Sequence, residues 1–431
     1  MAEPTEPAAG LVRALGRWDW TALVINSVIG SGIFGLPALL LGLVGGASPL
    51  ACLLAGAAIA VIALCFAEVA SRFQAAGGPY LYAREAFGSF VGLQVGWVAW
   101  LVRITSAAAN ANLLVIYLAE LWPDATGPAA RVALLTSLLL FFAAVNYRGV
   151  RWGVQVSNFF TVAKLLPLSL FILAGLFFLR GGSLIGQGGG SGRWADAMLL
   201  LVFAYGGFES AMIPASETRD PRRHAPFALL VGLGVVALVY GLVQLVVVGT
   251  LPPEAATDRP LAEAARQFLG TGGGMLMAAG AVISVSGLLS STMLNSPRLT
   301  YALAERGDFP AFFAAVHPRF RTPHLSILLY AALSWALAVW GSFEWNAVLS
   351  AVARLLIYLT TCAALLVLRR RGPAEAFRAP AGTACALAGI GFCLWLLARM
   401  GRGEFFILAA TFLLAAATWV WSRRQRGAAA G

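Results

Sequence analysis

Twelve apolar runs follow one another along this chain of 431 residues, each bounded by charged residues, glycine or proline. A helix of about 20 apolar residues crosses the hydrocarbon core of a bilayer, so each run is predicted to be a membrane-spanning helix. The chain is therefore predicted to be an all-α polytopic membrane protein. The predicted helices cover residues 17–44, 49–71, 85–118, 131–146, 151–179, 194–217, 225–250, 273–304, 323–341, 345–369, 382–399 and 403–422.

The composition agrees with this fold class. The chain is 60% hydrophobic and 11% charged, whereas a soluble chain is about 45–50% apolar and roughly 25% charged. A net charge of +11 would suggest a nucleic-acid partner for a soluble protein, but the cytoplasmic loops of membrane proteins carry excess arginine by themselves. We therefore expect the lipid bilayer, and no nucleic acid, as a partner. The five cysteines lie in or beside apolar runs and are interpreted as buried hydrophobic residues.

The arginines also predict an orientation. Twelve spans place both termini on the same side of the membrane. Most of the 30 Lys and Arg residues then fall in segments that are cytoplasmic if the N-terminus is inside. We predict a protein of the cell (inner) membrane with both termini in the cytoplasm.

Two of the predicted helices contain clusters of helix-breaking residues. The first holds Gly30–Gly32 followed by Pro37, and the sixth holds Tyr205–Gly207 followed by Glu209 and Pro214. Glycine weakens a helix by about 1 kcal/mol, and proline removes a bond to the preceding turn. Because the clusters occupy corresponding places in the two halves, they indicate broken helices around a midplane site. The alternative is close packing of small residues between helices.

Lys164 is the only lysine in the chain and lies in the middle of a predicted span. A charge inside the membrane is costly and usually functional, and a buried lysine releases its proton more readily than arginine does. We interpret Lys164 as a proton switch. The alternative is a static ammonium that bonds backbone carbonyls and holds the fifth helix against a broken one. Glu209, at the break in the sixth helix, either carries a proton or accepts hydrogen bonds from freed backbone amides.

Three further charged residues fall in apolar runs. Glu68, near the cytoplasmic end of the second helix, is predicted to pair locally in a structural role. Arg103 and Arg354 lie inside the third and tenth spans. They either line a water-filled vestibule or gate, or extend their charged ends toward the interface.

The breaks themselves predict a binding site for a zwitterion. The half-helix after Gly32 offers free N–H groups, which suit a carboxylate, and the half-helices ending near Ile29 and Ala204 offer free carbonyls, which suit an ammonium. Phe203 and Tyr205 are expected to close an aromatic lid over the site. The predicted substrate-binding residues are Ile29, Gly30, Ser31, Gly32, Ile33, Phe203, Ala204, Tyr205, Gly206, Gly207 and Phe208.

Enzymatic machinery is not visible in the sequence. A Walker A motif needs Gly-Lys, but the single lysine follows Ala163. No HExxH motif, Ser-His-Asp arrangement or Cys/His cluster is found, and the three histidines fall in predicted cytoplasmic segments. We expect no enzyme activity, no cofactor and no metal.

Four segments together resemble the amino acid–polyamine–organocation (APC) family of transporters. The first, Asn26–Phe34 with Gly35 and Pro37, matches the family's first-helix signature and is the most specific. The others are the sixth-helix break, the loop after helix two, and the connection between helices eight and nine. They comprise residues 203–210, residues 75–80 with Tyr82, and residues 295–301 with 307–310 and Thr322-Pro323.

The resemblance implies a LeuT-type fold of five plus five helices in an inverted repeat, with two extra C-terminal helices. It implies that the unwound parts of helices one and six hold the substrate during alternating access. In some proton-coupled bacterial members a lysine on helix five replaces the bound cation of sodium-driven relatives, and Lys164 matches that position. Arginine exchangers of the family gate with a tryptophan where this chain has Phe203, so aromatic gating is implied but not that specificity. The implied segments are a cytoplasmic tail 1–16, repeats 17–180 and 193–371, helices 380–422 and a cytoplasmic tail 423–431.

The function predicted is secondary active transport of an amino acid, coupled to protons as a symporter. The alternative within transport is a sodium-independent amino acid exchanger or exporter. A non-transporting amino acid sensor would need a signalling domain, which the short predicted tails do not hold. A channel would need a filter or a ring of acids, and neither is visible.

Overall fold

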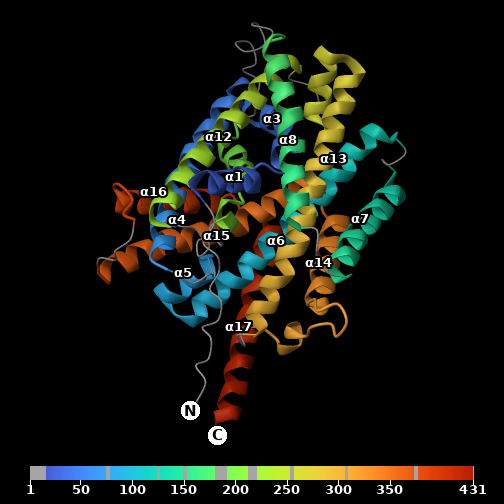
Figure 1. Cartoon of the computed structure of the whole chain (residues 1–431). Coiled ribbons are helices and arrows are strands. Elements are labelled where there is room, and N and C mark those ends of the chain that lie inside the picture. Colours follow the sequence, from blue (N-terminus) through green and yellow to red (C-terminus); the bar gives the residue numbers. More distant parts are fainter. Residues whose placement is uncertain are drawn as a thin grey trace, which may run out of the picture.

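The computed structural model describes residues 16–73, 78–123, 127–148, 153–179, 192–211, 221–252, 257–305, 309–372 and 377–430, and all regular structure within them is helical (Figure 1). Some predicted segments lie outside the described residues: the N-terminal tail to residue 15, parts of the predicted fifth and sixth helices (151–152 and 212–217), and residues 74–77 of the loop after the second helix.

The helices are α1 (Arg17–Val28), α2 (Gly32–Gly35), α3 (Pro37–Val44), α4 (Ser48–Ser71), α5 (Gly78–Phe87), α6 (Ser89–Leu121), α7 (Pro128–Arg148), α8 (Gly153–Leu176), α10 (Trp194–Ala204), α11 (Phe208–Ala211), α12 (Pro221–Thr250), α13 (Pro260–Glu305), α14 (His324–Trp340), α15 (Phe343–Arg370), α16 (Gly382–Leu397) and α17 (Arg402–Ala430), with short 3₁₀ turns at Gly45–Ala47 and Ala311–Ala314.

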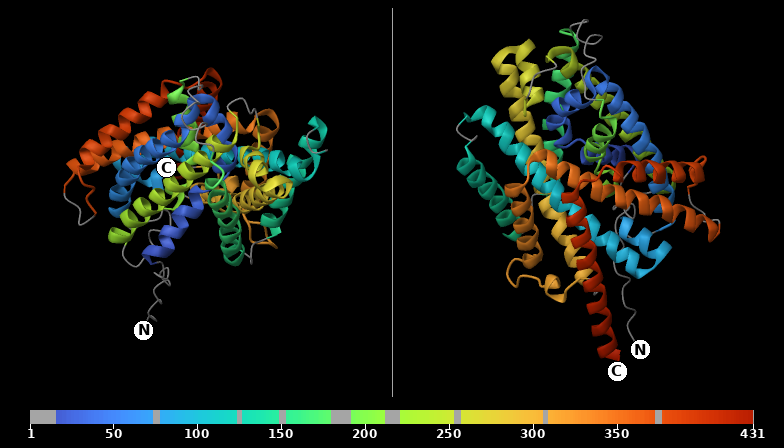
Figure 2. Two further views of the ribbon diagram at one scale, coloured as in Figure 1. Left: turned by 90° about the horizontal axis from the view of Figure 1, so that it is seen from above. Right: turned by 180° about the vertical axis from the view of Figure 1, so that it is seen from behind.

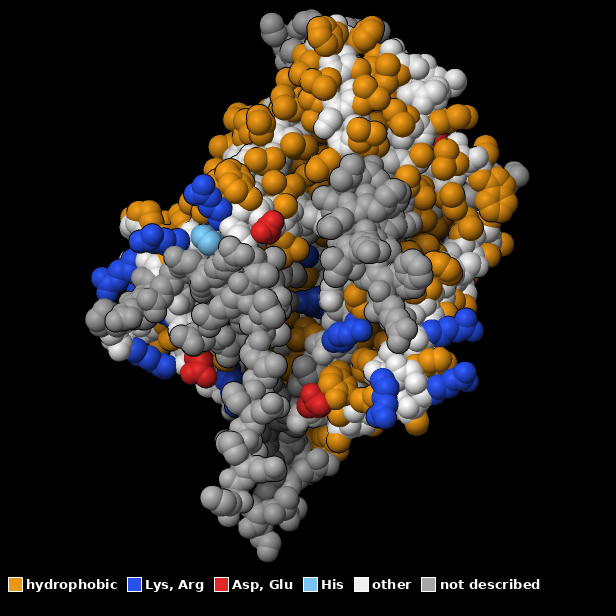
Figure 3. Space-filling view, viewed as in Figure 1, with side chains coloured by type: hydrophobic (Ala, Val, Ile, Leu, Met, Phe, Trp, Pro, Cys, Tyr) orange, Lys and Arg blue, Asp and Glu red, His pale blue; other side chains and the backbone are white. Residues whose placement is uncertain are grey.

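Seven helical segments of the described chain are long and apolar enough to cross a membrane, so the protein is a multi-pass membrane protein. Three shorter apolar helices accompany them, at Lys164–Leu176, His324–Trp340 and Gly382–Leu397. Hydrophobic side chains cover the upper part of the face seen in Figure 3, whereas Lys and Arg lie around its middle and lower parts. The seven segments are Pro37–Ser71, Ser89–Leu121, Pro128–Arg148, Arg223–Thr250, Pro260–Glu305, Phe343–Arg370 and Arg402–Ser422.

Several helix ends differ from the predicted boundaries. Gly88 adopts a φ of 93°, a conformation that glycine tolerates, and separates the short helix α5 from α6. The predicted start at residue 85 therefore falls in α5. Helix α13 begins at Pro260, before the predicted residue 273, and contains a kink at Gly270, where φ is 66°. At the C-terminus α17 continues to Ala430, through most of the predicted tail, and in Figures 1 and 2 it extends beyond the other helices.

Both predicted helix breaks are present. The chain leaves helical geometry at Ile29, where ψ is 98°, before α2 begins. The second break is the turn Tyr205–Gly207 between α10 and α11, and Gly207 has a φ of 124°. A side chain at Gly207 would overlap the carbonyl of Ser27, so glycine is required there for the two breaks to touch. The Trp20 indole also donates to Ala211 O at 2.7 Å, which ties α1 to α11.

The remaining helices pack around this crossing. Helix α12 lies along α4, while α13 and α15 both pack on α6, and α8 packs on α13 (Figures 1 and 2). Helices α15 and α16 run side by side at the edge of the molecule. Through these contacts the two breaks are enclosed by α6, α8, α12, α13 and α15.

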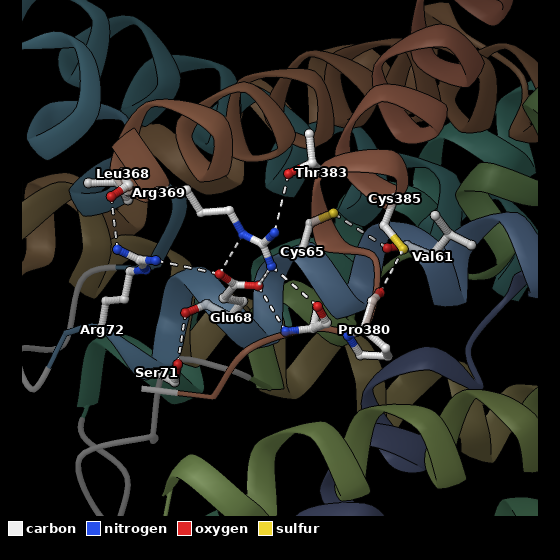
Figure 4. Close-up of polar contacts among 11 residues, drawn as sticks. Val61, Cys65, Glu68, Ser71, Arg72, Leu368, Arg369, Pro380, Thr383 and Cys385 are labelled. Carbon is white, nitrogen blue, oxygen red and sulfur yellow. Dashed lines mark hydrogen bonds and ion pairs between the residues drawn. The ribbon is translucent and has the colours of Figure 1, made fainter. Parts of the chain in front are cut away.

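A buried carboxylate joins α4 to α15 and to the segment before α16 (Figure 4). Glu68 has no exposed surface and accepts from Arg369 Nε at 2.8 Å, Arg369 Nη2 at 2.5 Å and the Ala379 amide at 2.9 Å. Arg72, one turn after Glu68, lies 3.5 Å from it and donates to Leu368 O at 2.9 Å. Glu68 therefore pairs locally, as predicted, and also with a residue far away in the sequence.

Replacing Glu68 with glutamine should destabilise the protein because Arg369 and Arg72 lose their counter-charge in a largely dry setting. We expect the free energy of unfolding to fall by on the order of 2 kcal/mol, measured as a fall of several degrees in the melting temperature in detergent. Glu344→Gln is the matched control because that carboxylate is exposed. Equal shifts in the two variants would contradict the structural role of Glu68.

Candidate substrate site

A cavity of about 360 Å³ lies where the two helix breaks meet. In Figure 3 blue side-chain atoms are visible in a recess near the middle of the face, among hydrophobic groups. The volume of the cavity falls within the range of small-molecule pockets. The cavity is lined by α1 and the first break, α6, the end of α7, α8, the second break, α13 and α15: Leu23, Asn26, Ser27, Val28, Gly30, Ser31, Gly32, Val102, Arg103, Ser106, Asn110, Val145, Asn146, Lys164, Phe203, Ala204, Gly206, Gly207, Glu209, Ser210, Ser284, Gly287, Leu288, Ser290, Ser291, Thr292, Leu294, Asn295 and Arg354.

Lys164 holds the end of α1 at the first break. Its Nζ donates to Asn26 O at 2.9 Å and to Ile29 O at 3.0 Å, and only 4% of the residue is exposed. A cation at a helix C-terminus is favoured by the helix dipole and satisfies carbonyls that have no partner in the helix. Among the described residues no carboxylate pairs with this ammonium, so its charge is balanced by backbone dipoles alone.

Tyr240 of α12 links the two breaks. Its hydroxyl lies 3.1 Å from Val28 O and 2.9 Å from Ala204 O, so its single proton is shared between the last carbonyl of α1 and that of α10. Sequence reasoning did not single out Tyr240, because a tyrosine in an apolar run carries no signal of its partner. The carbonyls of Ile29 and Ala204, which we expected to be free for an ammonium, are therefore already bonded to Lys164 and Tyr240.

The Glu209 carboxylate is bound by an arginine side chain and by a backbone amide at the second break. Its Oε1 accepts from Arg354 Nη1 at 2.8 Å, and its Oε2 accepts from the Gly207 amide at 2.9 Å and lies 3.3 Å from the Tyr358 hydroxyl. The guanidinium of Arg354 packs against Gly206, where a Cβ would overlap it. The hydrogen bond from the Gly207 amide matches one of the two roles expected for Glu209. The ion pair with Arg354 of α15 was not predicted from the sequence.

The other side of the first break presents backbone donors. The first helical bonds of this segment are donated by Phe34 and Gly35 to Ser31 O, at 3.1 and 3.0 Å. The N–H groups of Ser31, Gly32 and Ile33 precede these bonds and have no partner within the helix. Ser31 and Gly32 line the cavity, so this segment can donate to a carboxylate there.

Some of the residues that line the cavity carry polar atoms without a hydrogen-bond partner. Among the described side chains, buried atoms without a hydrogen-bond partner include Asn110 Oδ1, Asn146 Oδ1, Ser284 Oγ and Arg354 Nε, and all four residues line it. Buried polar groups in native proteins are otherwise nearly always satisfied. These four groups can form hydrogen bonds with water or with a polar solute in the cavity.

Not all predicted site residues face this space. Seven of the substrate-binding predictions line the cavity, together with Lys164 and Glu209, whereas Ile29, Ile33, Tyr205 and Phe208 do not. Tyr205 is fully buried and its hydroxyl donates to Cys52 O at 2.7 Å, so it does not form the lid expected with Phe203. Phe203 packs edge-on against Phe343 with ring centroids 6.1 Å apart. The seven are Gly30, Ser31, Gly32, Phe203, Ala204, Gly206 and Gly207.

A multi-pass helical protein with two broken helices around a polar cavity has the features of a membrane transporter of small solutes. The model of one transporter family, described as amino acid permease, matches residues 15–421. The chain therefore belongs to the amino acid permease family, within the APC superfamily, as the four sequence segments indicated.

Individual relatives agree with this membership. The serine/threonine exchanger SteT of Bacillus subtilis is 26% identical over 419 residues, which cover 94% of this chain and 92% of the relative. An uncharacterized transporter of Mycobacterium tuberculosis is 31% identical, covering 85% of this chain and 82% of the relative. The large neutral amino acids transporter small subunit 2 of Mus musculus is 29% identical, covering 84% and 70%.

Gly32→Leu tests whether the first break forms the binding site. A Cβ at Gly32 would lie 2.9 Å from Ala204 Cα, so a leucine must push the two breaks apart and fill the cavity between them. We expect binding of a labelled substrate to purified protein to be lost. Gly42→Leu is the control, because a Cβ at Gly42 meets nothing within 4 Å. Unchanged affinity in a well-folded Gly32→Leu variant would place the site elsewhere.

Proposed function

We propose that this protein is a secondary active transporter of amino acids that works by alternating access. The observation that carries the proposal is the meeting of two broken helices at a cavity lined by backbone donors, unpartnered polar atoms and buried charges. Family membership and the amino acid transporters among the relatives support it. We further propose twelve membrane helices in a five-plus-five inverted repeat with two extra helices, both termini being in the cytoplasm of a cell (inner) membrane protein.

The substrate's two charged groups have separate places in this proposal. The α-carboxylate binds the N–H groups at Ser31 and Gly32, where the positive end of the helix dipole favours an anion. The ammonium binds the unpartnered side-chain carbonyl oxygen of Asn110, which α6 contributes to the cavity lining. This assignment replaces the carbonyls of Ile29 and Ala204, which already have partners.

Phe203 is proposed as a gate. It lines the cavity and packs against Phe343, a residue at the start of α15 that does not line the cavity, and in this proposal the two rings close that side. Opening that side requires the pair to part, which would expose the site to the opposite side of the membrane. Alternating access then follows from movement of the broken helices relative to α6 and α15.

Proton coupling is proposed to run through Lys164. In its protonated form the side chain holds Asn26 O and Ile29 O and so fixes the end of α1. Loss of the proton removes the charge and one N–H donor, which weakens its hold on the broken helix. A pairing carboxylate would stabilise the charged form, and none is present among the described contacts of Lys164.

Exchange is the second candidate mode, favoured by the similarity to a serine/threonine exchanger. In an exchanger Lys164 serves as the static brace, and the return of the empty carrier is blocked without substrate. The cavity geometry is compatible with both modes. A transport experiment separates them.

Uptake of a panel of labelled amino acids into proteoliposomes should identify the substrate and the mode. For a proton symporter we expect accumulation only with an inward proton gradient. Uptake that ignores the gradient but requires an unlabelled amino acid inside would establish exchange. Binding without uptake in either condition would contradict transport and indicate a sensor.

Lys164→Ala tests the proton switch directly. We expect gradient-driven accumulation to be lost, because no titratable amine remains beside the first break. Lys164→Arg is the matched control, since it keeps the charge but does not release its proton, and it should also lose coupling. A Lys164→Ala protein that folds normally and accumulates substrate fully would overturn the role of Lys164 in coupling.

A further inference from the structure

We propose that Arg103 makes this site selective for acidic amino acids, by binding a second carboxylate in addition to the one shared by all amino acids. The inference rests on the proposed transport function and names the substrate class of the same cavity. It follows from an imbalance of charge among the groups that line the cavity.

Among the residues that the structure describes, the charged groups lining the cavity are three cations and one carboxylate: Arg103, Lys164, Arg354 and Glu209. A zwitterion leaves this imbalance unchanged because its own charges cancel. A solute with one extra carboxylate lowers it by one unit. Lys164 and Arg354 are nearly buried, and unbalanced charge of one sign is expensive where hydration is limited, so the cavity favours a net negative occupant.

Glu209 does not balance the excess. Its Oε1 accepts from Arg354 and its Oε2 accepts from the Gly207 amide and lies near the Tyr358 hydroxyl. Both oxygens are thus already engaged, and the one acid in the wall is used by a different arginine. Lys164 is satisfied by backbone carbonyls.

Arg103 is the third cation of the cavity lining, and it is not neutralised by an ion pair within the described residues. Within the described part of the chain its guanidinium makes no hydrogen bond or ion pair. Its backbone carbonyl accepts from the Tyr330 hydroxyl at 2.9 Å, which fixes the main chain and does not involve the guanidinium. The residue is partly exposed, so a solute in the cavity can reach it.

The position of Arg103 fits a second contact point for an elongated solute. Arg103, Ser106 and Asn110 follow one another at spacings of three and four residues, which places them on one face of α6, and all three line the cavity. At 1.5 Å per residue, Arg103 lies about 10 Å along the helix from Asn110. The proposed ammonium site and the proposed side-chain site are therefore separate positions along one wall.

Arginine also suits the ligand. Its planar guanidinium offers paired donors that match the two oxygens of a carboxylate. A residue with only a packing role would not need a charge there, since a charge without a counter-ion destabilises a membrane interior.

The test compares L-glutamate with L-glutamine, and L-aspartate with L-asparagine, because each pair differs by one charge at nearly constant size. Uptake by counterflow and binding by purified full-length protein are both measured. In the wild type we expect the acid to have an apparent affinity about tenfold or more above that of its amide. Arg103→Gln should abolish that preference, and Arg103→Lys should retain part of it. Arg298→Gln is the control: it removes an arginine from α13, outside the cavity lining, and should keep the preference.

The outcomes separate this inference from the proposed function. Transport of neutral amino acids with no preference for the acids, or a preference that survives Arg103→Gln, would overturn the role of Arg103 while leaving amino acid transport standing. If Arg298→Gln loses the preference for the acid to the same extent, the preference arises from the overall positive charge of the protein, and the inference is also overturned. Failure to bind or carry any amino acid of either kind would overturn both proposals.

Discussion

The backbone groups freed at the two helix breaks must find partners inside the protein, because lipid offers none. Three side chains meet much of this requirement. Lys164 bonds the end of α1, Tyr240 joins the ends of α1 and α10, and Glu209 accepts from the amide of Gly207. The site, the cavity and the charges around it depend on these bonds, since without them the interrupted helices would not persist in a membrane.

Two of the side chains that bond the backbone at the breaks, Lys164 and Glu209, are charged, and they bring charge to the edge of the cavity. Glu209 needs the counter-charge of Arg354, which is supplied by α15 at 2.8 Å. Each such bond also joins a broken helix to a continuous one, so the charges that stabilise the breaks are placed to respond when these helices move. Within the described part of the chain, the same arrangement leaves Arg103 at the cavity without an ion-pair partner, and this is the basis of the proposed preference for acidic solutes.

The membrane helices and the breaks were predictable from local sequence. Apolar length marks a span, and clustered glycine marks a place where the helix is weak, so both breaks fall where they were expected. Helix ends were less predictable, because the extension of α13 to Pro260 and the division at Gly88 depend on packing against neighbours as much as on composition. Tyr205 shows the same limit, since its neighbours turn it toward Cys52 and away from the cavity.

The sequence by itself determined the class of protein and the location of the two breaks, and it singled out Lys164 and Glu209 as charges within apolar runs. These follow from the cost of charge and of weak helices in lipid, which depends on each residue and its immediate neighbours. Only the tertiary structure decided which partners these groups have. Arg354 is 145 residues from Glu209, and Lys164 is 138 residues from Asn26. Such pairs are set by how helices cross, and no local pattern of residues encodes that crossing.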